Sequence, residues 1–401
     1  MKKVLIASLT LPYANVPHAG GKTHYYYLQK LLSSSSLEVN LISFCRPEEK
    51  EKNDLKGANT NIICLEDNIF SRALRFLCNF KSRFNFFDSK GNFSPGIYKF
   101  HIKRYLKQLK SKNYMPDIII MEWTQIVLLS ELFSEYFPDA KLVASEHDVS
   151  FLLFQRKLFI EKGAIQKYIN KIRYNNLKNA ELYNLKHCDL IITHNEKDKQ
   201  LLCENNIDIA KIFTIVPYFK DYSYLKWHHS KNRIIFYGAM GRPENYLSAI
   251  WFIENVFNDL QIDDLQLCVV GNNPPKQLLQ YARNNIIITG YQEKIDDFLS
   301  DCLCMVAPLI LGAGIKVKIL EALSAGVPVL TNSIGIEGIP VYSGIEYIHC
   351  ESDEEYKSII SNIINDEDRL NKISLNAQKF MKENYNLSES INKYYNAIMK
   401  L

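Results

Sequence analysis

The sequence predicts an α/β protein built from two doubly wound domains, each with a parallel sheet covered by helices. Three observations lead to this prediction. The chain has 401 residues, which is enough for two domains of ordinary size. Short β-branched segments alternate with longer segments of helical period, the pattern of repeated strand–helix–strand units. Most of the short segments are apolar throughout, as expected for strands with both faces buried.

Six candidate strands lie in the first half of the chain and five in the second. Those in the first half are Lys3–Leu9, Glu38–Phe44, Asn61–Leu65, Asp117–Met121, Lys141–Ser145 and Asp189–Thr193. Those in the second half are Arg233–Tyr237, Gln266–Val270, Asn285–Thr289, Cys304–Ala307 and Val327–Thr331. The helical segments between them supply the crossovers that parallel strands require. Each half is therefore expected to form its own sheet.

The boundary between the two domains is expected near residue 220. From Val216 to Asn232 the chain has no clear periodicity and is rich in Tyr, Lys, Trp and His. We therefore predict a first domain over residues 1–220 and a second over residues 221–385. A last helical segment, 386–401, is expected to pack back on one of the domains, with the first as the candidate. Two such domains generally bind a ligand in the cleft between the carboxyl ends of their strands.

Composition excludes several classes of protein. Hydrophobic residues make up 47% and charged residues 23% of the chain, so it is neither disordered nor a coiled coil. The longest apolar runs are far shorter than the about 20 residues that a membrane span requires. The apolar stretch at the start runs into Pro12 without a small-residue cleavage site, which favours a buried strand over a signal peptide. Nine scattered cysteines lack zinc-site spacing, so we expect reduced thiols, no metal and a cytoplasmic protein.

The net charge of +4 is unevenly distributed. Residues 72–112 contain eleven Lys or Arg against the single acid Asp88, and residues 156–178 contain seven against Glu161. Both segments are interleaved with Phe, Tyr and Leu. Such a face suits an anionic membrane surface, and the alternative is an ordinary solvated helix face. No nucleic-acid recognition motif accompanies the charge, so nucleic acid is not an expected partner.

The segment Pro308–Thr331, PLILGAGIKVKILEALSAGVPVLT, carries the strongest local signal for a binding site. It predicts a strand end, then a glycine loop, then a helix that begins near Ile315. Gly312 and Gly314 allow backbone amides to approach an anion, and the helix N-terminus adds its partial positive charge. The alternative is an ordinary glycine turn followed by a solvated Lys–Glu pair.

Three side chains of the predicted helix add to this signal. Lys316 and Lys318 can place positive charge against a diphosphate. Glu321 lies on the same helix face as Lys318, where its carboxylate can accept hydrogen bonds from a ribose diol.

The run as a whole resembles the donor-binding segment of GT-B-fold glycosyltransferases of the family 4 type, whose pattern is G-x-G-x-[KR]-x-K-x-L-E-A-x-x-x-G-x-P-V. Further pieces agree in order and spacing, namely RIIFYG (233–238), LCVVG (267–271), TGY (289–291) and IGIEG (334–338). Near the start, Gly20-Gly21 resembles the family's glycine loop, and Ser145-Glu-His-Asp148 resembles its histidine element. The resemblance covers residues 1–395 in layout and is most specific across 233–340.

The resemblance implies two Rossmann-like domains facing a cleft, and a transferase that moves a sugar from a nucleotide-diphosphate donor to an acceptor. Transfer in this family generally retains the anomeric configuration and uses no bound metal, so no cofactor is implied beyond the nucleotide sugar. The expected acceptor is a glycan or a polyprenyl-diphosphate-linked glycan. The expected setting is the synthesis of a bacterial surface polysaccharide or cell-envelope glycan, on the inner face of the cytoplasmic membrane.

The resemblance also implies roles for individual residues. His147 is expected beside the donor sugar, and Lys316 or Lys318 beside the leaving diphosphate. Glu321 is expected to hold the ribose. The other donor-binding residues that the resemblance implies are Gly20, Gly21, Arg242, Gly312, Gly314, Ile315 and Glu337. His18 and His24, which flank the glycine pair, are expected at the surface.

The sequence departs from the family pattern at two places. Ala313 stands where relatives have the first acid of a Glu-x7-Glu motif, and the loop after the first strand of the second domain offers Arg242 but no lysine. Two alternatives to a transferase follow. A GT-B sugar-nucleotide epimerase would need acid–base carboxylates around the sugar, which Ala313 argues against. A non-catalytic nucleotide-sugar-binding or scaffold protein of the same fold is the other alternative.

Overall fold

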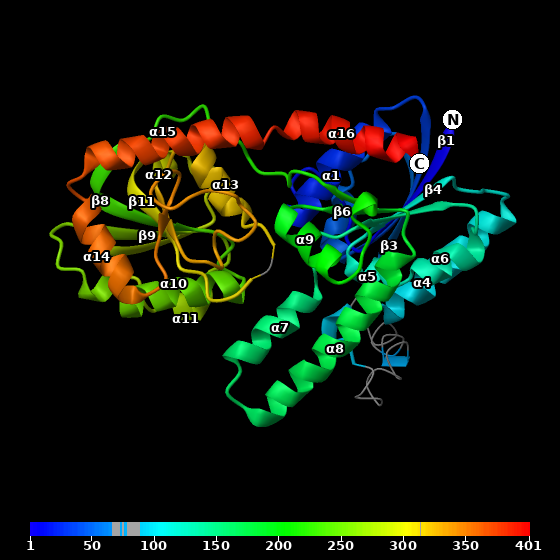
Figure 1. Cartoon of the computed structure of the whole chain (residues 1–401), viewed down its shortest axis with the longest axis horizontal. Helices are drawn as coiled ribbons and strands as arrows, with labels where there is room; N and C mark the ends of the chain where they lie inside the picture. The colour runs from blue at the N-terminus through cyan, green and yellow to red at the C-terminus, as the bar shows by residue number, and fades with distance from the viewer. Residues whose placement is uncertain (66–72, 74–75, 78–88, 313) are drawn as a thin grey trace. The chain divides into compact units, whose positions relative to one another are not determined.

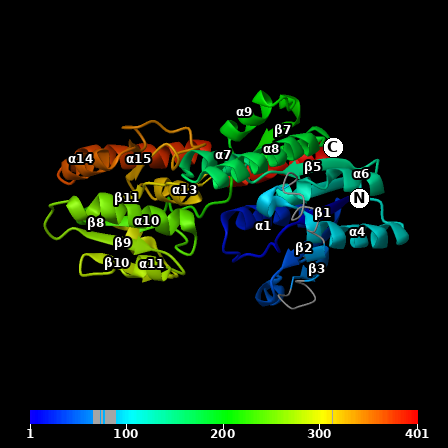
Figure 2. The ribbon, with the colours of Figure 1, turned by 90° about the horizontal axis from the view of Figure 1, so that it is seen from below.

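The computed structural model describes residues 1–65, 73, 76–77, 89–312 and 314–401, and it divides into two compact units (Figure 1). Unit 1 consists of Met1–Tyr218 together with Leu387–Leu401, and unit 2 of Phe219–Asn386. Each unit contains one sheet with helices on both faces, as Figures 1 and 2 show. Among the residues described, no helix combines the length and the apolar character that crossing a membrane requires.

Unit 1 is built on a seven-stranded sheet of order β3-β2-β1-β4-β5-β6-β7, in which every neighbouring pair is parallel. Its strands are β1 (Lys2–Ser8), β2 (Leu37–Cys45), β3 (Ala58–Cys64), β4 (Ile118–Glu122), β5 (Lys141–Ser145), β6 (Leu190–Thr193) and β7 (Ile212–Thr214). The chain moves outward from β1 to one edge, returns to β4, and then moves outward to the other edge. This is the doubly wound topology that the sequence predicts, and that prediction is confirmed.

The strands of unit 1 are apolar throughout because both faces of the sheet are buried. On β1, Val4 and Ile6 belong to one apolar cluster, and Leu5 and Ala7 to another on the opposite face. Side chains of β4 alternate between the same two clusters. A strand buried on only one face would show alternating polar positions instead.

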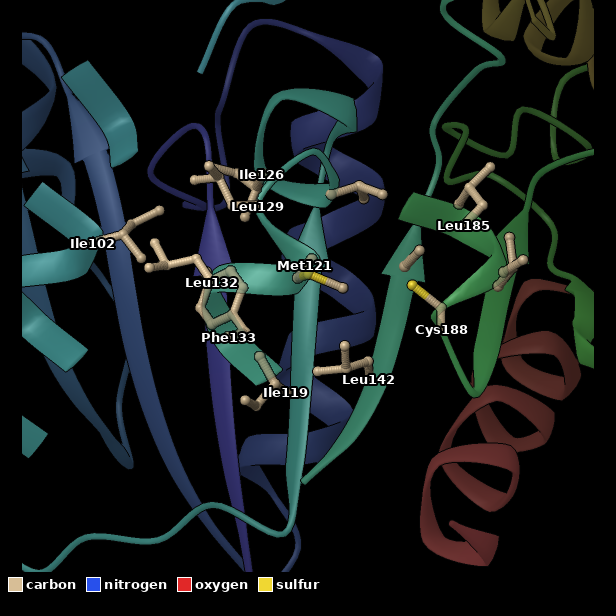
Figure 3. Close-up of a cluster of buried hydrophobic side chains, with 14 of the residues drawn as sticks. Ile102, Ile119, Met121, Ile126, Leu129, Leu132, Phe133, Leu142, Leu185 and Cys188 are labelled. Carbon is tan, nitrogen blue, oxygen red and sulfur yellow. The ribbon is translucent and has the colours of Figure 1, made fainter. Parts of the chain in front are cut away.

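Helices from different parts of the chain cover the two faces of this sheet. They are α1 (Ala19–Leu32), α4 (Gly96–Ser111), α5 (Thr124–Val127), α6 (Ser130–Tyr136), α7 (Phe151–Ile160), α8 (Ala164–Lys186), α9 (Glu196–Glu204) and α16 (Leu387–Lys400), with 3₁₀ turns at Pro47–Lys52, Gly91–Phe93 and Ile209–Lys211. Figure 3 shows the cluster on one face, where Ile102 of α4 and Phe133 of α6 pack over Ile119 and Met121 of β4. Helices α1 and α16 cover the other face.

Helix α16 belongs to unit 1 although it follows all of unit 2 in the chain. Tyr394 and Ile398 are buried against the same cluster as Tyr27 and Leu28 of α1. The hydroxyl of Tyr27 hydrogen-bonds that of Ser390 at 2.7 Å. At the other end of α16, the ammonium of Lys2 donates to the backbone carbonyl of Met399 at 2.9 Å. The last helix is therefore an integral part of the first unit.

Unit 2 is built on a six-stranded parallel sheet of order β10-β9-β8-β11-β12-β13. Its strands are β8 (His228–Tyr237), β9 (Gln266–Val270), β10 (Ile286–Gly290), β11 (Asp301–Ala307), β12 (Val329–Thr331) and β13 (Ile348–His349). Its helices are α10 (Pro243–Asn255), α11 (Lys276–Leu279), α12 (Asp296–Ser300), α13 (Val317–Ser324), α14 (Asp353–Ile363) and α15 (Glu367–Asn384), with a 3₁₀ turn at Phe257–Asp259. Renumbered from its own first strand, the order is the 3-2-1-4-5-6 of dinucleotide-binding sheets.

Every strand expected from the sequence is present, with ends that shift by a few residues. Two further strands, β7 and β13, are not predicted from the sequence, and both are short and lie at sheet edges. The expected start of a helix near Ile315 needs correction, because α13 begins at Val317 and Lys316 is its N-cap with extended backbone angles. Lys316 therefore belongs to the loop and not to the helix.

Candidate functional site

In both units the expected site residues lie at the carboxyl edge of the sheet, next to the strand pair where the chain order reverses. In unit 1 this pair is β1 and β4, and in unit 2 it is β8 and β11. Ligands of open α/β sheets bind at such switch points. The residues of the two units form two separate clusters, which are described in turn.

In unit 2, the glycine loop after β11 has a backbone that only glycine adopts readily. Gly312 has a φ of +135° and Gly314 a φ of +65°. A Cβ added to Gly312 would lie 3.0 Å from Cε of Lys316, so a side chain there would crowd the lysine. Ala313, the residue that departs from the family pattern, lies outside the described residues.

Lys316 folds back over this loop. Its ammonium donates to the carbonyl of Gly314 at 2.5 Å and lies 3.7 Å from Oε2 of Glu337. Both side chains are 10% exposed. Ile315 is half-buried between the loop and the helix. Lys316 and Glu337 thus form a nearly buried ion pair beside the N-terminus of α13, whose first amides have no partners within the helix.

Lys318, in the first turn of α13, places its ammonium in an enclosed environment. The ammonium donates to Oδ1 of Asn245 at 2.8 Å and lies 5.0 Å from the centre of the Phe236 ring. Burial lowers the pKa of Lys318 to about 7, while the charge of Glu244 raises it and that of Arg242 lowers it. The lysine is therefore only partly protonated near neutral pH, although a bound anion would favour its charged form.

Glu321 lies one turn further along α13 and is 8% exposed. Its Oε1 accepts a hydrogen bond from the backbone amide of Lys220 at 3.2 Å. The buried hydroxyl of Tyr237 also hydrogen-bonds to Glu321, and burial together with this carboxylate raises the pKa of the tyrosine. The carboxylate is thus fixed by two neighbours at the carboxyl edge of β8. Lys318 and Glu321 share a helix face, as expected, but each bonds to a different partner.

Arg242 is the N-cap residue of α10 and is the most exposed of the expected donor-binding side chains. Its side chain is 61% exposed, and its guanidinium forms an ion pair with Glu244. The loop between β8 and α10 has no lysine, but Lys318 reaches Asn245 in the first turn of α10. The ammonium of Lys318, on α13, therefore lies beside the segment between β8 and α10, which has no lysine of its own.

In unit 1, the glycine pair lies in a helix and not in a loop. Gly20 and Gly21 are in the first turn of α1, where Nδ1 of the N-cap residue His18 accepts a hydrogen bond from the amide of Gly21 at 2.9 Å. A Cβ on Gly20 would lie 3.1 Å from Nδ1 of His147. The absence of a side chain at Gly20 thus lets the start of α1 approach the histidine.

The imidazole of His147 contacts Glu122, His194 and Trp123. Its Nε2 lies 3.0 Å from Oε2 of Glu122, and its Nδ1 lies 3.2 Å from Nε2 of His194. The ring of Trp123 stacks on it with centroids 4.5 Å apart. Burial lowers the pKa of His147 to about 3, so the ring is neutral at physiological pH. Both ring nitrogens of His147 therefore already have partners within unit 1.

Glu122, Trp123, His24 and His194 were not singled out from the sequence, and the expectation that His24 lies at the surface is wrong. His24 is 4% exposed. The hydroxyl of Ser8 donates its proton to the carbonyl of Thr10 at 2.6 Å and therefore accepts from Nδ1 of His24 at 3.3 Å. Nε2 of His24 then carries a lone pair, 3.9 Å from Oε1 of Glu122. Burial raises the pKa of Glu122 and lowers that of His24 to about 4, so burial disfavours the charged form of both side chains.

Glu146, next to His147 in the chain, is also buried but has different partners. It is 1% exposed, and its Oε2 accepts a hydrogen bond from the hydroxyl of Thr124 at 2.7 Å. Its Oε1 is buried and has no hydrogen-bond partner among the residues that the structure describes. Burial raises the pKa of Glu146 to about 8, so the carboxyl is largely protonated at neutral pH.

Within the described residues, no cluster of three or more His, Cys, Asp or Glu side chains has the geometry of a metal site. The positive groups in the unit 2 cluster are the side chains of Lys316 and Lys318 and the amides at the start of α13. These groups suit an anion such as a diphosphate.

Comparison with known proteins gives one family match and one curated relative. Residues 231–366, which lie within unit 2, match the model described as Glycosyl transferases group 1. The relative is an uncharacterized 44.6 kDa protein in the cps region of Klebsiella pneumoniae, 24% identical over 410 residues, which cover 96% of this chain and 97% of the relative.

Several solved structures resemble the whole chain at low sequence identity. A sucrose-phosphate synthase from Thermosynechococcus elongatus has a TM-score of 0.69 at 13% identity, covering 100% of this chain and 99% of its own. Anabaena HepE in complex with UDP has a TM-score of 0.64 at 12% identity, with both chains covered in full (100%). S. aureus TarM, solved with Fondaparinux, alpha-GlcNAc-glycerol and UDP, also has a TM-score of 0.64 at 12% identity, with 99% of both chains covered. The chain therefore has a GT-B fold of two Rossmann-like domains.

Proposed function

We propose that this protein is a glycosyltransferase that moves a sugar from a nucleoside-diphosphate donor to a glycan or lipid-linked acceptor. The observation that carries the proposal is the cluster at the start of α13, where a glycine loop, two lysines and a fixed carboxylate meet at the switch point of unit 2. The match of residues 231–366 to Glycosyl transferases group 1 includes this cluster. We assign the protein to the family 4 type on the pattern of its Gly312–Glu321 segment.

The donor would bind through its two ends. Glu321 is a preformed acceptor for the ribose hydroxyls, because Lys220 and Tyr237 already fix its carboxylate. Amides around Gly312, Gly314 and Ile315 would bind the diphosphate, with Lys316 and Lys318 as the balancing cations. Arg242 and Glu337 flank this position as further donor contacts.

The step itself breaks the bond between the sugar C1 and the diphosphate oxygen. Negative charge then grows on the diphosphate, and Lys316 and Lys318 stabilise it together with the N-terminus of α13. Lys318 has a pKa of about 7 in the free protein, so the arriving diphosphate draws it into its charged form. These groups supply the positive charge that the step requires, and the proposal therefore includes no metal.

Unit 1 would supply the acceptor side. His147 is neutral, and Glu122 and His194 occupy its two ring nitrogens, so we assign to its backbone carbonyl the contact with the positively charged sugar. The new bond would form on the face that the diphosphate leaves, with retention of configuration. The acceptor hydroxyl would pass its proton to the departing phosphate oxygen.

The acceptor we propose is a glycan or a polyprenyl-diphosphate-linked glycan, made on the inner face of the cytoplasmic membrane during surface-polysaccharide synthesis. The relative in a cps region supports a role in polysaccharide synthesis. HepE was solved with UDP, and TarM with UDP, Fondaparinux and alpha-GlcNAc-glycerol, which supports a nucleotide sugar and a glycan as partners.

The test compares Glu321→Gln with Glu293→Gln, a matched change at an exposed glutamate of unit 2. Calorimetric titration with UDP, GDP, ADP and CMP identifies the preferred nucleotide for the wild type. Glu321→Gln should weaken its binding by roughly 10–100-fold, because a ribose hydroxyl loses a charge-assisted hydrogen bond of about 1.5–3 kcal/mol. Glu293→Gln should bind like the wild type. Equal affinity in Glu321→Gln would contradict the ribose assignment.

A turnover assay distinguishes a glycosyltransferase from a non-catalytic nucleotide-sugar-binding protein. The wild type should consume the sugar conjugate of the preferred nucleotide when a membrane extract supplies acceptor, and the product linkage should keep the donor's anomeric configuration by NMR. Nucleotide binding without any turnover would instead favour a nucleotide-sugar-binding protein of the same fold. The loop after β8 favours that alternative, because Arg242 is its only cation and is paired with Glu244.

A further inference from the structure

The hairpin of α7 and α8 is a projecting element of unit 1 with an unusual tip. In Figure 1 the two helices run side by side and extend away from the sheet of unit 1. We call the residues 157–171 at its far end the hairpin tip; they comprise the end of α7, the connection at 161–163 and the first turns of α8. The hairpin tip combines exposed apolar side chains with a surplus of positive charge.

The apolar side chains of the hairpin tip are large and open to solvent. Phe159 is 81% exposed, Ile165 80% and Tyr168 57%. On α8, Ile165, Tyr168 and the half-buried Ile172 lie within an arc of about 60°, since each residue turns the helix by about 100°. Exposed side chains of this size cluster where a protein meets a partner.

The charge around these side chains is predominantly positive. Lys157, Lys162, Lys167 and Lys171 are all exposed, and Glu161 is the only acid within the hairpin tip. Lys167 and Lys171 flank the apolar arc of α8 on one side. An amphipathic surface with lysines around exposed aromatic and aliphatic groups matches an anionic lipid surface, where headgroups attract the lysines and the apolar groups enter the interface.

The root of the hairpin is buried in unit 1, whereas its tip is exposed. Glu181 of α8 is fully buried, and its carboxylate accepts hydrogen bonds from the amides of Ser150 at 2.8 Å and Phe151 at 3.1 Å. Phe154 and Leu177 are buried in the core of unit 1. The hairpin is thus anchored at the start of α7, directly after the Ser145–Asp148 segment that contains His147.

We propose that the hairpin tip docks unit 1 onto an anionic bilayer. This inference rests on the proposed function, because a lipid-linked acceptor requires the enzyme to work at a membrane surface. It adds the place of contact, 157–171. It also adds a structural consequence, since docking through a hairpin anchored in unit 1 fixes the position of the His147 segment relative to the lipid surface.

The experiment is co-sedimentation of the full-length protein with two kinds of vesicle, phosphatidylcholine alone and phosphatidylcholine mixed with phosphatidylglycerol. The apolar variant is Phe159→Ser with Ile165→Ser, and the charge variant is Lys162→Glu with Lys167→Glu. The matched control is Tyr342→Ser with Leu375→Ser, which removes side chains of unit 2 that are 70% and 67% exposed. Because the changed residues are exposed, all variants should keep the wild-type melting temperature.

We expect the wild type and the matched control to bind the anionic vesicles and not the neutral ones. Each hairpin variant should lower the partition coefficient on anionic vesicles at least tenfold. Equal binding to both vesicles, or hairpin variants that bind like the wild type, would overturn the proposal. So would light scattering that shows a dimer which the apolar variant converts to a monomer, because the hairpin tip would then contact a second copy.

A nucleotide titration of the same variants distinguishes this proposal from the proposed function. The hairpin variants should bind the preferred nucleotide with wild-type affinity, because no donor-binding residue is changed. If the wild type binds anionic vesicles through the hairpin but binds no nucleotide, the proposed function fails and the docking surface stands. If it binds nucleotide but not vesicles, only the docking surface fails.

Discussion

The replacement Lys318→Met should stabilise unit 2 and weaken donor binding at the same time. In the free protein the ammonium of Lys318 is enclosed, with Asn245 as its hydrogen-bond acceptor at 2.8 Å and the Phe236 ring 5.0 Å away. Methionine has a similar length and no charge to bury. The change therefore separates the cost of holding this lysine in place from its use in binding.

The shift of its pKa from 10.5 to about 7 sets the magnitude. At about 1.4 kcal/mol for each pKa unit, burying a protonated Lys318 at neutral pH costs up to about 5 kcal/mol. Methionine recovers this cost but loses the hydrogen bond to Asn245 and the contact with Phe236, together about 2–3 kcal/mol. The net gain of about 2 kcal/mol should raise the melting temperature by roughly 4–8 °C.

The shifted pKa of Lys318 also predicts how the stability of the wild type changes with pH. Between pH 7 and 10.5 the unfolded chain holds a proton on Lys318 that the folded protein does not, so wild-type stability should rise with pH in this window. Lys318→Met removes that dependence, and its advantage should therefore shrink towards pH 10. Differential scanning calorimetry at several pH values measures this difference, with Lys276→Met at an exposed lysine as the control.

The effect of Lys318→Met on donor binding is measured by titration with the preferred nucleoside diphosphate. Loss of a charge-assisted contact of about 1.5–3 kcal/mol should weaken binding by roughly 10–100-fold. A lower melting temperature in Lys318→Met at pH 7 would refute the reasoning about burial. Unchanged nucleotide affinity would refute the placement of the diphosphate at the start of α13.

Two further predictions concern stability. Glu146→Gln should raise the melting temperature of unit 1, and the increase should grow from pH 5 to pH 8. Because the pKa of Glu146 is about 8 in the folded protein, the folded protein retains a proton that the unfolded chain releases above pH 4.5. The stability of the wild type therefore falls from pH 5 to pH 8, and the glutamine variant lacks this loss. Calorimetry at both pH values checks this, and a gain independent of pH would contradict it. Gly271→Ala should destabilise unit 2 by several kcal/mol, because its Cβ would lie 1.6 Å from the carbonyl oxygen of Gly238. Gly290→Ala, at a positive φ but with no atom of the described residues within 4 Å of the added Cβ, should cost only about 1–2 kcal/mol. Equal losses in urea unfolding would show that the clash at Gly271 is relieved.

The sheets could be predicted from the sequence because each central strand is a continuous apolar run. Lys141–Ser145 and Gln266–Val270 match their expected bounds, since burial on both faces leaves a strong signal over five residues. β7 and β13 span only Ile212–Thr214 and Ile348–His349. At edges of the sheets, such short segments owe their structure to the neighbouring strand and not to a pattern of their own.

The glycine loop and α13 could be located for a similar reason, since one continuous segment supplies the loop, the lysines and Glu321. The partners of these side chains could not be predicted. Lys318 bonds to Asn245 and Glu321 to Lys220, residues that are distant in the sequence and adjacent only after the sheet forms. The two-residue error at the start of α13 arose because nothing in the sequence separates an N-cap lysine from a first-turn lysine.

The cluster around Glu122 shows the same limit more strongly. His24 is buried because Ser8 and Glu122, from the ends of β1 and β4, offer it polar neighbours. His194 follows β6 and reaches His147 after β5. Ser8, Glu122, His147 and His194 all stand at or just after a strand end, whereas His24 lies within α1. A search for polar residues at the ends of predicted parallel strands would have found Glu122 and His194, but not their contacts.

The position of α16 has a consequence for the order in which the protein folds during synthesis. All of unit 2 has been translated by Asn386, whereas unit 1 still lacks the helix that covers Tyr27 and Leu28. The unit that begins first is therefore completed last, in contrast to chains whose N-terminal domain folds before the rest appears. Until α16 arrives, an apolar face of the first sheet remains uncovered in the nascent chain. A stop codon shortly after residue 386 would make this exposure permanent, and chaperone dependence and aggregation would follow even though every residue of the proposed site is present.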